Sequence, residues 1–228
     1  MEQFTRLISL IGKNNYDKIK NTKVLVLGLG GVGGYATISL IRSGIENITI
    51  IDYDTIDISN LNRQIITNMS NIGMKKTNVM KDEILKINPN CTIDVIDMKL
   101  DIDNYLEIFK NKIDYVIDAC DTIKVKEKVI EYCINNNIKV ISCMGTGKKL
   151  NPSMLEITDI RNTSYDPIAK TIRKYIRDNK IKGKIPVVYS KEPPRDTGDV
   201  IGSFCFVVAV AGMLCSSYVI NDIIKESN

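Results

Sequence analysis

The sequence predicts one α/β domain with a doubly wound, mostly parallel sheet that is flanked by helices. Two observations support this prediction: short apolar runs alternate with helical patterns along the chain, and a glycine-rich turn directly follows the first apolar run. The 228 residues are 44% hydrophobic and 25% charged, which excludes disorder and collagen. Without an internal repeat or a linker rich in proline or serine, residues 1–228 are expected to form a single domain.

The elements are expected in the following order. Residues 2–11 favour a short amphipathic helix that stops at Gly12. Residues 23–27 form a continuous apolar run, as in a buried parallel strand, and the glycine-rich turn leads from it into a helix that ends at 43–44. Later strands are expected at 48–53, 92–99, 115–119 and 139–144, and helices at 75–87 and 124–133.

A further helix is predicted to begin at Asp166-Pro167, with the aspartate as N-cap and the proline in the first turn. Its basic residues fall at positions i, i+3, i+4 and i+7 and so share one face: Lys170, Arg173, Lys174 and Arg177. Such a face is either simply solvated or a contact for nucleic-acid phosphates.

Residues 204–220 contain no charge, which brings the segment to the lower limit for a membrane-spanning helix. Gly212 and two serines interrupt its apolar character. We therefore expect a buried core helix or a dimer-interface helix, and no transmembrane segment.

Histidine is absent, which excludes Ser-His and Cys-His catalytic pairs within one chain as well as imidazole metal sites. None of the six cysteines forms a C-x-x-C pair, so no zinc site is indicated, and a reducing cytoplasm is the expected location. The net charge of +4 permits contact with nucleic acid without requiring it.

The glycine-rich turn predicts a nucleotide site. Gly28, Gly30 and Gly33 follow a strand and precede a helix, and Gly31 lies in the same turn, where backbone amides and the helix N-terminus can bind phosphate. Asp52 ends the next strand, about twenty residues on, where an acidic residue can bind ribose hydroxyls. Taken alone, this pattern is typical of a nicotinamide-dependent dehydrogenase.

The residues that follow favour ATP instead. Arg63, within the polar stretch Asn60-Leu61-Asn62-Arg63-Gln64, and Lys76 could neutralise a triphosphate. Asp121, after the strand expected at 115–119, could hold Mg²⁺. A dinucleotide seldom needs two extra cations and a metal-binding acid.

These residues, in this order, resemble the ThiF-type family of adenylating enzymes, relatives of ubiquitin-activating enzymes with a Rossmann-like fold. The matching motifs are Arg6-x-x-x-Leu10, the GxGGxG turn, Asp52-Tyr53-Asp54, NLNRQ, GMKK and ACDT. The resemblance implies that a carboxylate attacks the α-phosphate of ATP. It also implies a homodimer in which Arg6 reaches the ATP of the neighbouring subunit.

By motif matching, Asp52 would bind ribose, Asn60, Arg63 and Lys76 would face phosphates, Gln64 would line the same pocket, and Asp121 would hold Mg²⁺. Asp54 either belongs to this site or only caps the following turn.

The second half of the chain is similar to one branch of this family, the tRNA threonylcarbamoyladenosine dehydratases. The matching segments include Ile157-Thr158-Asp159-Ile160, Thr163-Ser164-Tyr165-Asp166-Pro167 and Tyr189-Ser190-Lys191-Glu192. The resemblance implies ATP-dependent cyclisation of threonylcarbamoyladenosine in the tRNA anticodon loop, and phosphate contacts for the basic helix face. Some members of the branch also use a monovalent cation or a sulfur-relay protein.

Three other functions stay open at this point. The chain could adenylate the C-terminal glycine of a ubiquitin-like sulfur carrier, although it lacks the zinc pairs of such enzymes and has no cysteine between Met144 and Phe204. It could be a dehydrogenase, which NLNRQ and Lys76 disfavour. A non-catalytic nucleotide-binding partner is the third alternative, which the intact Arg63, Lys76 and Asp121 argue against.

Overall fold

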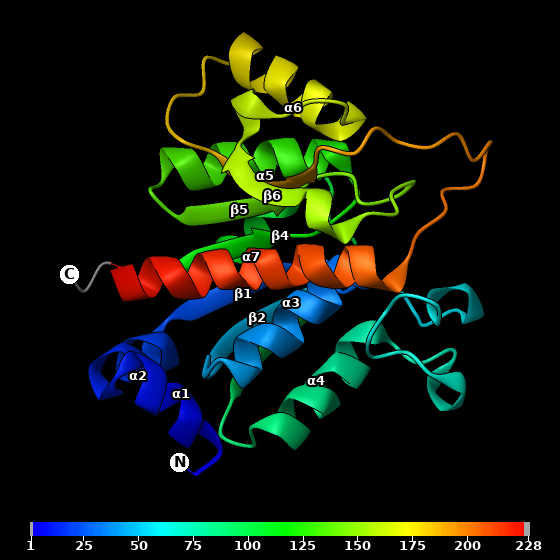
Figure 1. Ribbon diagram of the computed structural model, residues 1–228. Helices are drawn as coiled ribbons and strands as arrows, with labels where there is room; N and C mark the ends of the chain where they lie inside the picture. Colours follow the sequence, from blue (N-terminus) through cyan, green and yellow to red (C-terminus); the bar gives the residue numbers. More distant parts are fainter. Residues whose placement is uncertain (1, 226–228) are drawn as a thin grey trace.

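The computed structural model describes residues 2–225, which fold around a seven-stranded sheet (Figure 1). The strands lie in the spatial order β3-β2-β1-β4-β5-β7-β6. Their bounds are β1 Lys23–Leu27, β2 Asn47–Asp52, β3 Thr92–Asp97, β4 Tyr115–Asp118, β5 Lys139–Cys143, β6 Leu155–Asp159 and β7 Pro186–Ser190. Neighbouring strands are parallel except β6 and β7, which are antiparallel. The predicted mostly parallel sheet is confirmed.

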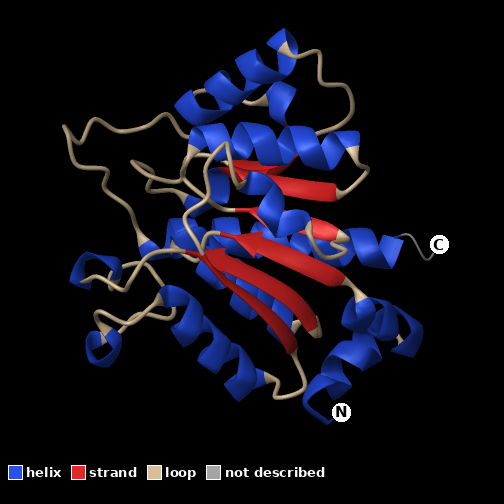
Figure 2. Cartoon of the chain, turned by 180° about the vertical axis from the view of Figure 1, so that it is seen from behind, coloured by secondary structure: helices blue, strands red, loops and turns tan. Residues whose placement is uncertain are grey.

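Helices cover both faces of the sheet, as the two opposite views show (Figures 1 and 2). Their bounds are α1 Thr5–Ile11, α2 Lys13–Asn21, α3 Gly31–Arg42, α4 Lys76–Ile87, α5 Ile123–Asn135, α6 Pro167–Asp178 and α7 Cys205–Lys225. In β1, Val24 and Val26 belong to the core cluster that includes α3 and α7, whereas Leu25 and Leu27 belong to the cluster that includes α5. Because side chains alternate along a strand, β1 is apolar throughout and is buried on both faces.

The strand order changes direction at β1. Strands β2 and β3 are added on one side of β1, and strands β4 and β5 on the other side. The connections that leave β1 and β4 therefore diverge, and a crevice opens between them at the carboxyl ends of the strands.

Helix α7 lies across the sheet beside α3 (Figure 1). Ala211 is fully buried, and the hydroxyl of Ser216 donates to the hydroxyl of Ser39 on α3 at 2.9 Å. Within residues 2–225, α7 is the one helix long and apolar enough to cross a membrane. In its apolar 18-residue stretch, 44% is buried inside the protein. The predicted core helix is confirmed for this packed face, while Phe206 and Met213 are 45% and 50% exposed.

Two parts of the fold differ from the expected elements. The helix expected at 2–11 is a 3-10 turn, Glu2–Phe4, followed by α1, and a second helix, α2, follows Gly12. Helix α2 buries only Tyr16 and Ile19, which gives too short an apolar repeat to recognise in the sequence. Strands β6 and β7 were also unexpected; each is only five residues long, and β6 lies partly exposed at the sheet edge.

Candidate active site

A pocket of about 920 Å³ opens at the carboxyl ends of the central strands. It brings together ten of the residues predicted for nucleotide binding: Gly28, Gly30, Gly31, Asp52, Asp54, Asn60, Arg63, Gln64, Lys76 and Asp121. The pocket lies at the point where the strand order reverses, which is where open α/β sheets bind ligands. Gly33 lies behind the pocket wall, and Arg6 is exposed on α1 and does not line the pocket of its own chain.

The glycine turn holds the first turn of α3 against the end of β1. A Cβ atom added to Gly33 would lie 1.7 Å from the carbonyl oxygen of Gly28, so a side chain at this position would force the two segments apart. Gly30 caps α3 without any side-chain hydrogen bond to the helix. The amides of the first turn are therefore available to an anion, and the helix dipole favours one there.

Asp52, which is 9% exposed, joins this turn to the end of β2. Its Oδ2 accepts a hydrogen bond from the amide of Leu29 at 2.6 Å, and its Oδ1 accepts one from the amide of Asp54 at 2.9 Å. Each carboxylate oxygen has a second lone pair, which can accept a hydrogen bond from a ligand hydroxyl. The ribose-binding role predicted for Asp52 is compatible with these bonds.

Two cations lie along the same wall. The Lys76 side chain is 5% exposed, and its Nζ is 2.7 Å from Oδ2 of Asp54. Arg63 donates to the carbonyl oxygen of Ser59 at 2.7 Å and to Oδ1 of Asn62 at 2.9 Å. No carboxylate among residues 2–225 lies within 4 Å of the Arg63 guanidinium, so its charge is available for a phosphate.

Gln64 supplies a buried acceptor without a partner. The residue is 6% exposed, and its Oε1 forms no hydrogen bond although it is closed to solvent. A buried acceptor left unsatisfied costs about 1–3 kcal/mol. Gln64 lines the pocket, but its Oε1 is closed even to water, so a donor on a ligand could reach this atom only after the side chain has turned.

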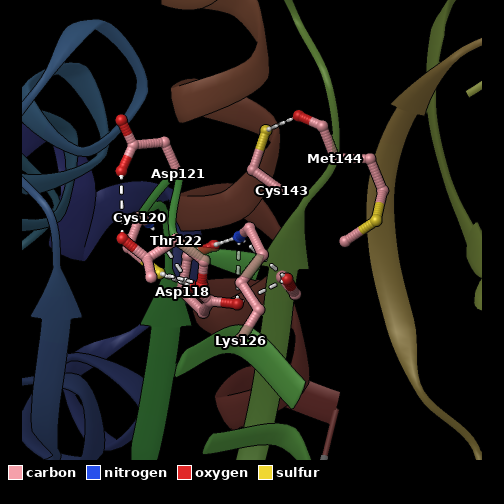
Figure 3. Close-up of polar contacts among 8 residues, drawn as sticks. Asp118, Cys120, Asp121, Thr122, Lys126, Cys143 and Met144 are labelled. Carbon is pink, nitrogen blue, oxygen red and sulfur yellow. Dashed lines mark hydrogen bonds and ion pairs between the residues drawn. The ribbon is translucent and has the colours of Figure 1, made fainter. Parts of the chain in front are cut away.

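Below the pocket, a buried ion pair supports the turn that carries Asp121 (Figure 3). Asp118 ends β4 and is fully buried; its Oδ2 accepts from Nζ of Lys126 at 3.0 Å and from the hydroxyl of Ser142 at 2.6 Å. Its Oδ1 accepts from the amide of Cys120 at 3.3 Å. One carboxylate thus joins β4, β5, α5 and the turn after β4. Burial is the largest single influence on Lys126 and lowers its pKa, but the charge and hydrogen bond of Asp118, together with Cys120 and Cys143, outweigh burial and raise the pKa to about 12.

Asp121 extends from this turn towards solvent at the pocket rim. It contributes one carboxylate, and no three His, Cys, Asp or Glu side chains gather into a metal-binding group in the part of the chain that the structure describes. Mg²⁺ at nucleotide sites takes one or two carboxylates and completes its shell with phosphate oxygens and water. Asp121 fits that pattern.

Cys120 is the cysteine beside Asp121, and it also lines the pocket. Burial and the neighbouring Asp118 carboxylate raise the pKa of the Cys120 thiol well above its ordinary value. Its Sγ donates to Oδ1 of Asp118 at 3.1 Å. Because the thiolate is the nucleophilic form, Cys120 is unsuited to form a thioester at neutral pH.

The opposite wall consists of two segments that the sequence did not predict as part of the site. Residues 144–150 follow β5, and residues 191–204, called the strap here, connect β7 to α7. The amide of Lys148 donates to the carbonyl oxygen of Gly202 at 2.8 Å, and the amide of Arg195 donates to the carbonyl oxygen of Lys148 at 2.9 Å. Nδ2 of Asn62 donates to the carbonyl oxygen of Ser203 at 3.0 Å, which attaches the strap to the Arg63 loop.

Helix α6 begins at the edge of this wall. As predicted, Asp166 caps it, and Oδ1 of Asp166 accepts from the amide of Ala169 at 2.8 Å. Its Oδ2 accepts from the amide of Gly145 at 2.9 Å, which fixes the start of α6 to the loop after β5. The basic face therefore starts beside the pocket.

A shallow groove follows the predicted basic face of α6. Lys170, Lys174 and Arg177 are exposed along it. Arg173 is half-buried, and its guanidinium donates to the carbonyl oxygen of Thr163 at 3.1 Å and also to the Thr163 hydroxyl. Three of the four predicted side chains therefore face solvent, although Arg177 also pairs with Asp178 at 3.2 Å, while Arg173 braces the helix.

The model of the ThiF family matches residues 4–227. The tRNA threonylcarbamoyladenosine dehydratase of Bacillus subtilis (strain 168) is 36% identical over 244 residues, which cover 99% of this chain and 96% of that protein. The crystal structure of the E. coli tRNA N6-threonylcarbamoyladenosine dehydratase in complex with ATP has a TM-score of 0.94 and 30% identity, covering 99% of this chain and 95% of that one.

The adenylyltransferase and sulfurtransferase UBA4 of Vanderwaltozyma polyspora is 39% identical over 138 residues, which cover 60% of this chain and 31% of that protein. Similarity to the dehydratases therefore covers nearly the whole chain, whereas similarity to the sulfurtransferase covers about three fifths of it.

Proposed function

Because this chain belongs to the ThiF family, we propose that it uses ATP to activate a carboxylate, namely that of threonylcarbamoyladenosine in tRNA. The observation that supports this most directly is the phosphate-binding wall, where Lys76 and Arg63 lie near the glycine turn and Arg63 has no carboxylate within 4 Å among residues 2–225. Activation of a sulfur carrier is less well supported, because the second half of the chain matches dehydratases and Cys120 is held as a thiol.

The proposed reaction mainly requires stabilisation of the negative charge on the phosphates. An oxygen of the substrate carboxylate would attack the α-phosphorus of ATP, and the bond from that phosphorus to pyrophosphate would break. A nucleophilic atom of the same threonylcarbamoyl group would then attack the activated carbonyl carbon, and AMP would leave, so that the substrate loses one water in total. The first step needs no general base, because the carboxylate is ionised at neutral pH.

The chain's own residues have distinct tasks in this scheme. Asp52 would hold the ribose, and Arg63 and Lys76 would stabilise the charge that builds up on the phosphates. Asp121 would hold Mg²⁺, which supplies further positive charge to the phosphate oxygens. Ring closure is favoured by proximity, since both reacting groups belong to one substituent.

We further propose that the exposed basic residues of α6 bind tRNA phosphates, because α6 starts at the pocket edge. A homodimer would explain why Arg6 lies outside its own pocket. The half-exposed Phe206 and Met213 on α7 offer an apolar surface for the second copy. We propose the cytoplasm as the location, where ATP and mature tRNA are both present. A bound monovalent cation and a sulfur-relay partner remain proposals based on the family resemblance.

The direct test is incubation of the protein with ATP, Mg²⁺ and tRNA that carries threonylcarbamoyladenosine, followed by mass spectrometry of the digested nucleosides. A product lighter by one water, formed only with ATP, is the expected result. Arg63→Ala and Asp121→Ala should form none, while Lys86→Ala on the outer surface of α4 is the matched control. An unchanged nucleoside mass with folded, ATP-binding protein would rule out the proposed reaction.

A further inference from the structure

Lys149 is a buried cation without a neighbouring anion. Three lysines are buried among residues 2–225, and two of them have a carboxylate partner: Lys76 pairs with Asp54 and Lys126 pairs with Asp118. Lys149 is 3% exposed, and its Nζ donates to the backbone carbonyl oxygen of Glu192, with no carboxylate oxygen within 4 Å in the part of the chain described.

The groups that face Lys149 do not compensate its charge fully. Asp166, at the start of α6, and Glu192, on the strap, both favour the charged form at longer range. Each is already engaged elsewhere: Asp166 accepts from two backbone amides, and the Glu192 carboxylate accepts from the amides of Leu150 and Asn151 at 2.8–3.1 Å. Arg195 lies 3.9 Å from Glu192 and adds positive charge. Burial is the largest influence on Lys149 and lowers its pKa from 10.5.

A buried charge without a partner is costly, and in a pocket wall an anionic ligand can remove that cost. Lys149 lines the same pocket as the phosphate-binding residues. Its position relative to them follows from the strand order β2-β1-β4-β5. Asp52 ends β2 at one flank, the glycine turn and Asp121 follow β1 and β4 in the middle, and Lys149 follows β5 at the other flank. A nucleotide held by Asp52 and the glycine turn would leave the Lys149 flank to the second substrate.

We propose that Lys149 binds the carboxylate of the substrate nucleoside and holds it beside the nucleotide phosphates. This proposal rests on the proposed function. It assigns the part of that site that binds the carboxylate-bearing substrate, called the acceptor side here. Two anions must come together for the reaction, and a cation on the acceptor side reduces their repulsion. Lys149 is thus the residue that distinguishes a tRNA bearing the carboxylate from one without it.

The test compares the affinity for two tRNAs, one bearing threonylcarbamoyladenosine and one with plain adenosine at that position. An ATP analogue that cannot be cleaved between its α- and β-phosphates is present throughout. Wild-type protein should prefer the modified tRNA. In Lys149→Met, this preference should fall about 10-fold or more, as expected for loss of a charge-assisted hydrogen bond, while affinity for the unmodified tRNA and for the analogue stays constant. Lys149→Arg should retain part of the preference.

A structural role for Lys149 predicts a different pattern. The matched control is Glu192→Ala, which removes both acceptors that attach residues 150–151 to the strap but leaves the ammonium of Lys149 in place. It should keep the preference for modified tRNA. The preference of the wild-type protein should also decline as pH rises towards 10.5, because the lowered pKa makes Lys149 lose its charge earlier than an exposed lysine does.

Unchanged preference in Lys149→Met, or an equal loss in Glu192→Ala, would overturn the assignment of Lys149. Formation of the dehydrated nucleoside by wild-type protein reports separately on the proposed function. If wild type dehydrates the tRNA and Lys149→Met keeps its preference, only the assignment of Lys149 fails. If wild type removes no water, both fail.

Discussion

The ammonium of Lys126 lies 3.0 Å from the carboxylate of Asp118, and the two side chains are only 1% and 0% exposed. This pair connects α5 to the end of β4, directly below the turn that presents Asp121 (Figure 3). Because Asp118 also accepts from the hydroxyl of Ser142 and from both the amide and the thiol of Cys120, the position of the turn depends on four donors around one carboxylate. The rim of the pocket is therefore held from beneath.

Breaking this pair should destabilise the protein strongly. Lys126→Met leaves Asp118 buried without its cation, and we expect the free energy of unfolding to fall by about 3–5 kcal/mol in urea titrations. The raised pKa of Lys126 means that its contribution to the wild-type protein is fully present below pH 10.5 and is lost as pH rises through about 12. Lys86→Met, which breaks an exposed pair with Glu83, should cost less than about 1 kcal/mol.

Two alanine substitutions in the glycine turn should separate folding from nucleotide binding. In Gly33→Ala the new methyl group would overlap the carbonyl oxygen of Gly28, so both stability and ATP affinity should fall. In Gly30→Ala the methyl group would meet only Nε2 of Gln64, at 3.9 Å, and would otherwise enter the pocket.

Gly30→Ala should therefore keep the unfolding free energy within about 0.5 kcal/mol of wild type and still bind ATP about 10-fold more weakly or worse. Calorimetric titration and urea unfolding measure the two quantities. Equal ATP affinity in Gly30→Ala and wild type would show that phosphates do not lie over this turn.

Charge reversal on α6 should weaken tRNA binding without affecting ATP binding. In the triple variant of Lys170, Lys174 and Arg177 to Glu, the affinity for tRNA should decrease uniformly for modified and unmodified forms. The plot of log affinity against log salt concentration should become less steep, with its negative slope smaller in magnitude by about 0.7–0.9 for each phosphate that the variant no longer neutralises. Lys81→Glu with Lys86→Glu on α4 provides a control that reverses two charges instead of three, and a proportionate decrease in that control would indicate a non-specific effect.

Arg6 can be tested by mixing two inactive variants. Arg6→Ala and Arg63→Ala should each fail to dehydrate the tRNA alone. If Arg6 acts in the neighbouring subunit, a mixed dimer contains one site with both arginines, and the mixture should regain activity. A mixture that remains inactive after exchange of subunits has been demonstrated would place the function of Arg6 within its own chain.

The phosphate side of the site could be predicted because it is local in the sequence. Gly28 to Gly33 and Asp52 directly follow apolar runs, so the edge of the sheet where they lie follows from the strand pattern alone. The acceptor side could not be predicted in the same way. The burial of Lys149 depends on Glu192, which is 43 positions away and reaches it only through the short strands β6 and β7. The sequence feature that could have indicated the acceptor side is the pair of adjacent lysines at 148 and 149, just after the strand expected at 139–144.

The elements of the fold also divide into those that a local sequence pattern identifies and those that depend on distant residues. The apolar runs of β1 and β5 identify buried strands, whereas α2 stabilises the domain by burying only Tyr16 and Ile19 and therefore has little pattern of its own. The position of β6 at the sheet edge, antiparallel to β7, depends on long-range pairing that no local residue preference specifies.

The central position of β1 has a consequence for synthesis on the ribosome. Strand β2 can pair with one edge of β1 early, and β3 then pairs with β2, but the other edge of β1 pairs with β4, which begins only at Tyr115. At about 5–20 residues per second, that edge of β1 lacks its partner strand for several seconds in every nascent chain. Unpaired apolar edges are where chains aggregate, so chaperone dependence during translation is expected to end once β4 has emerged.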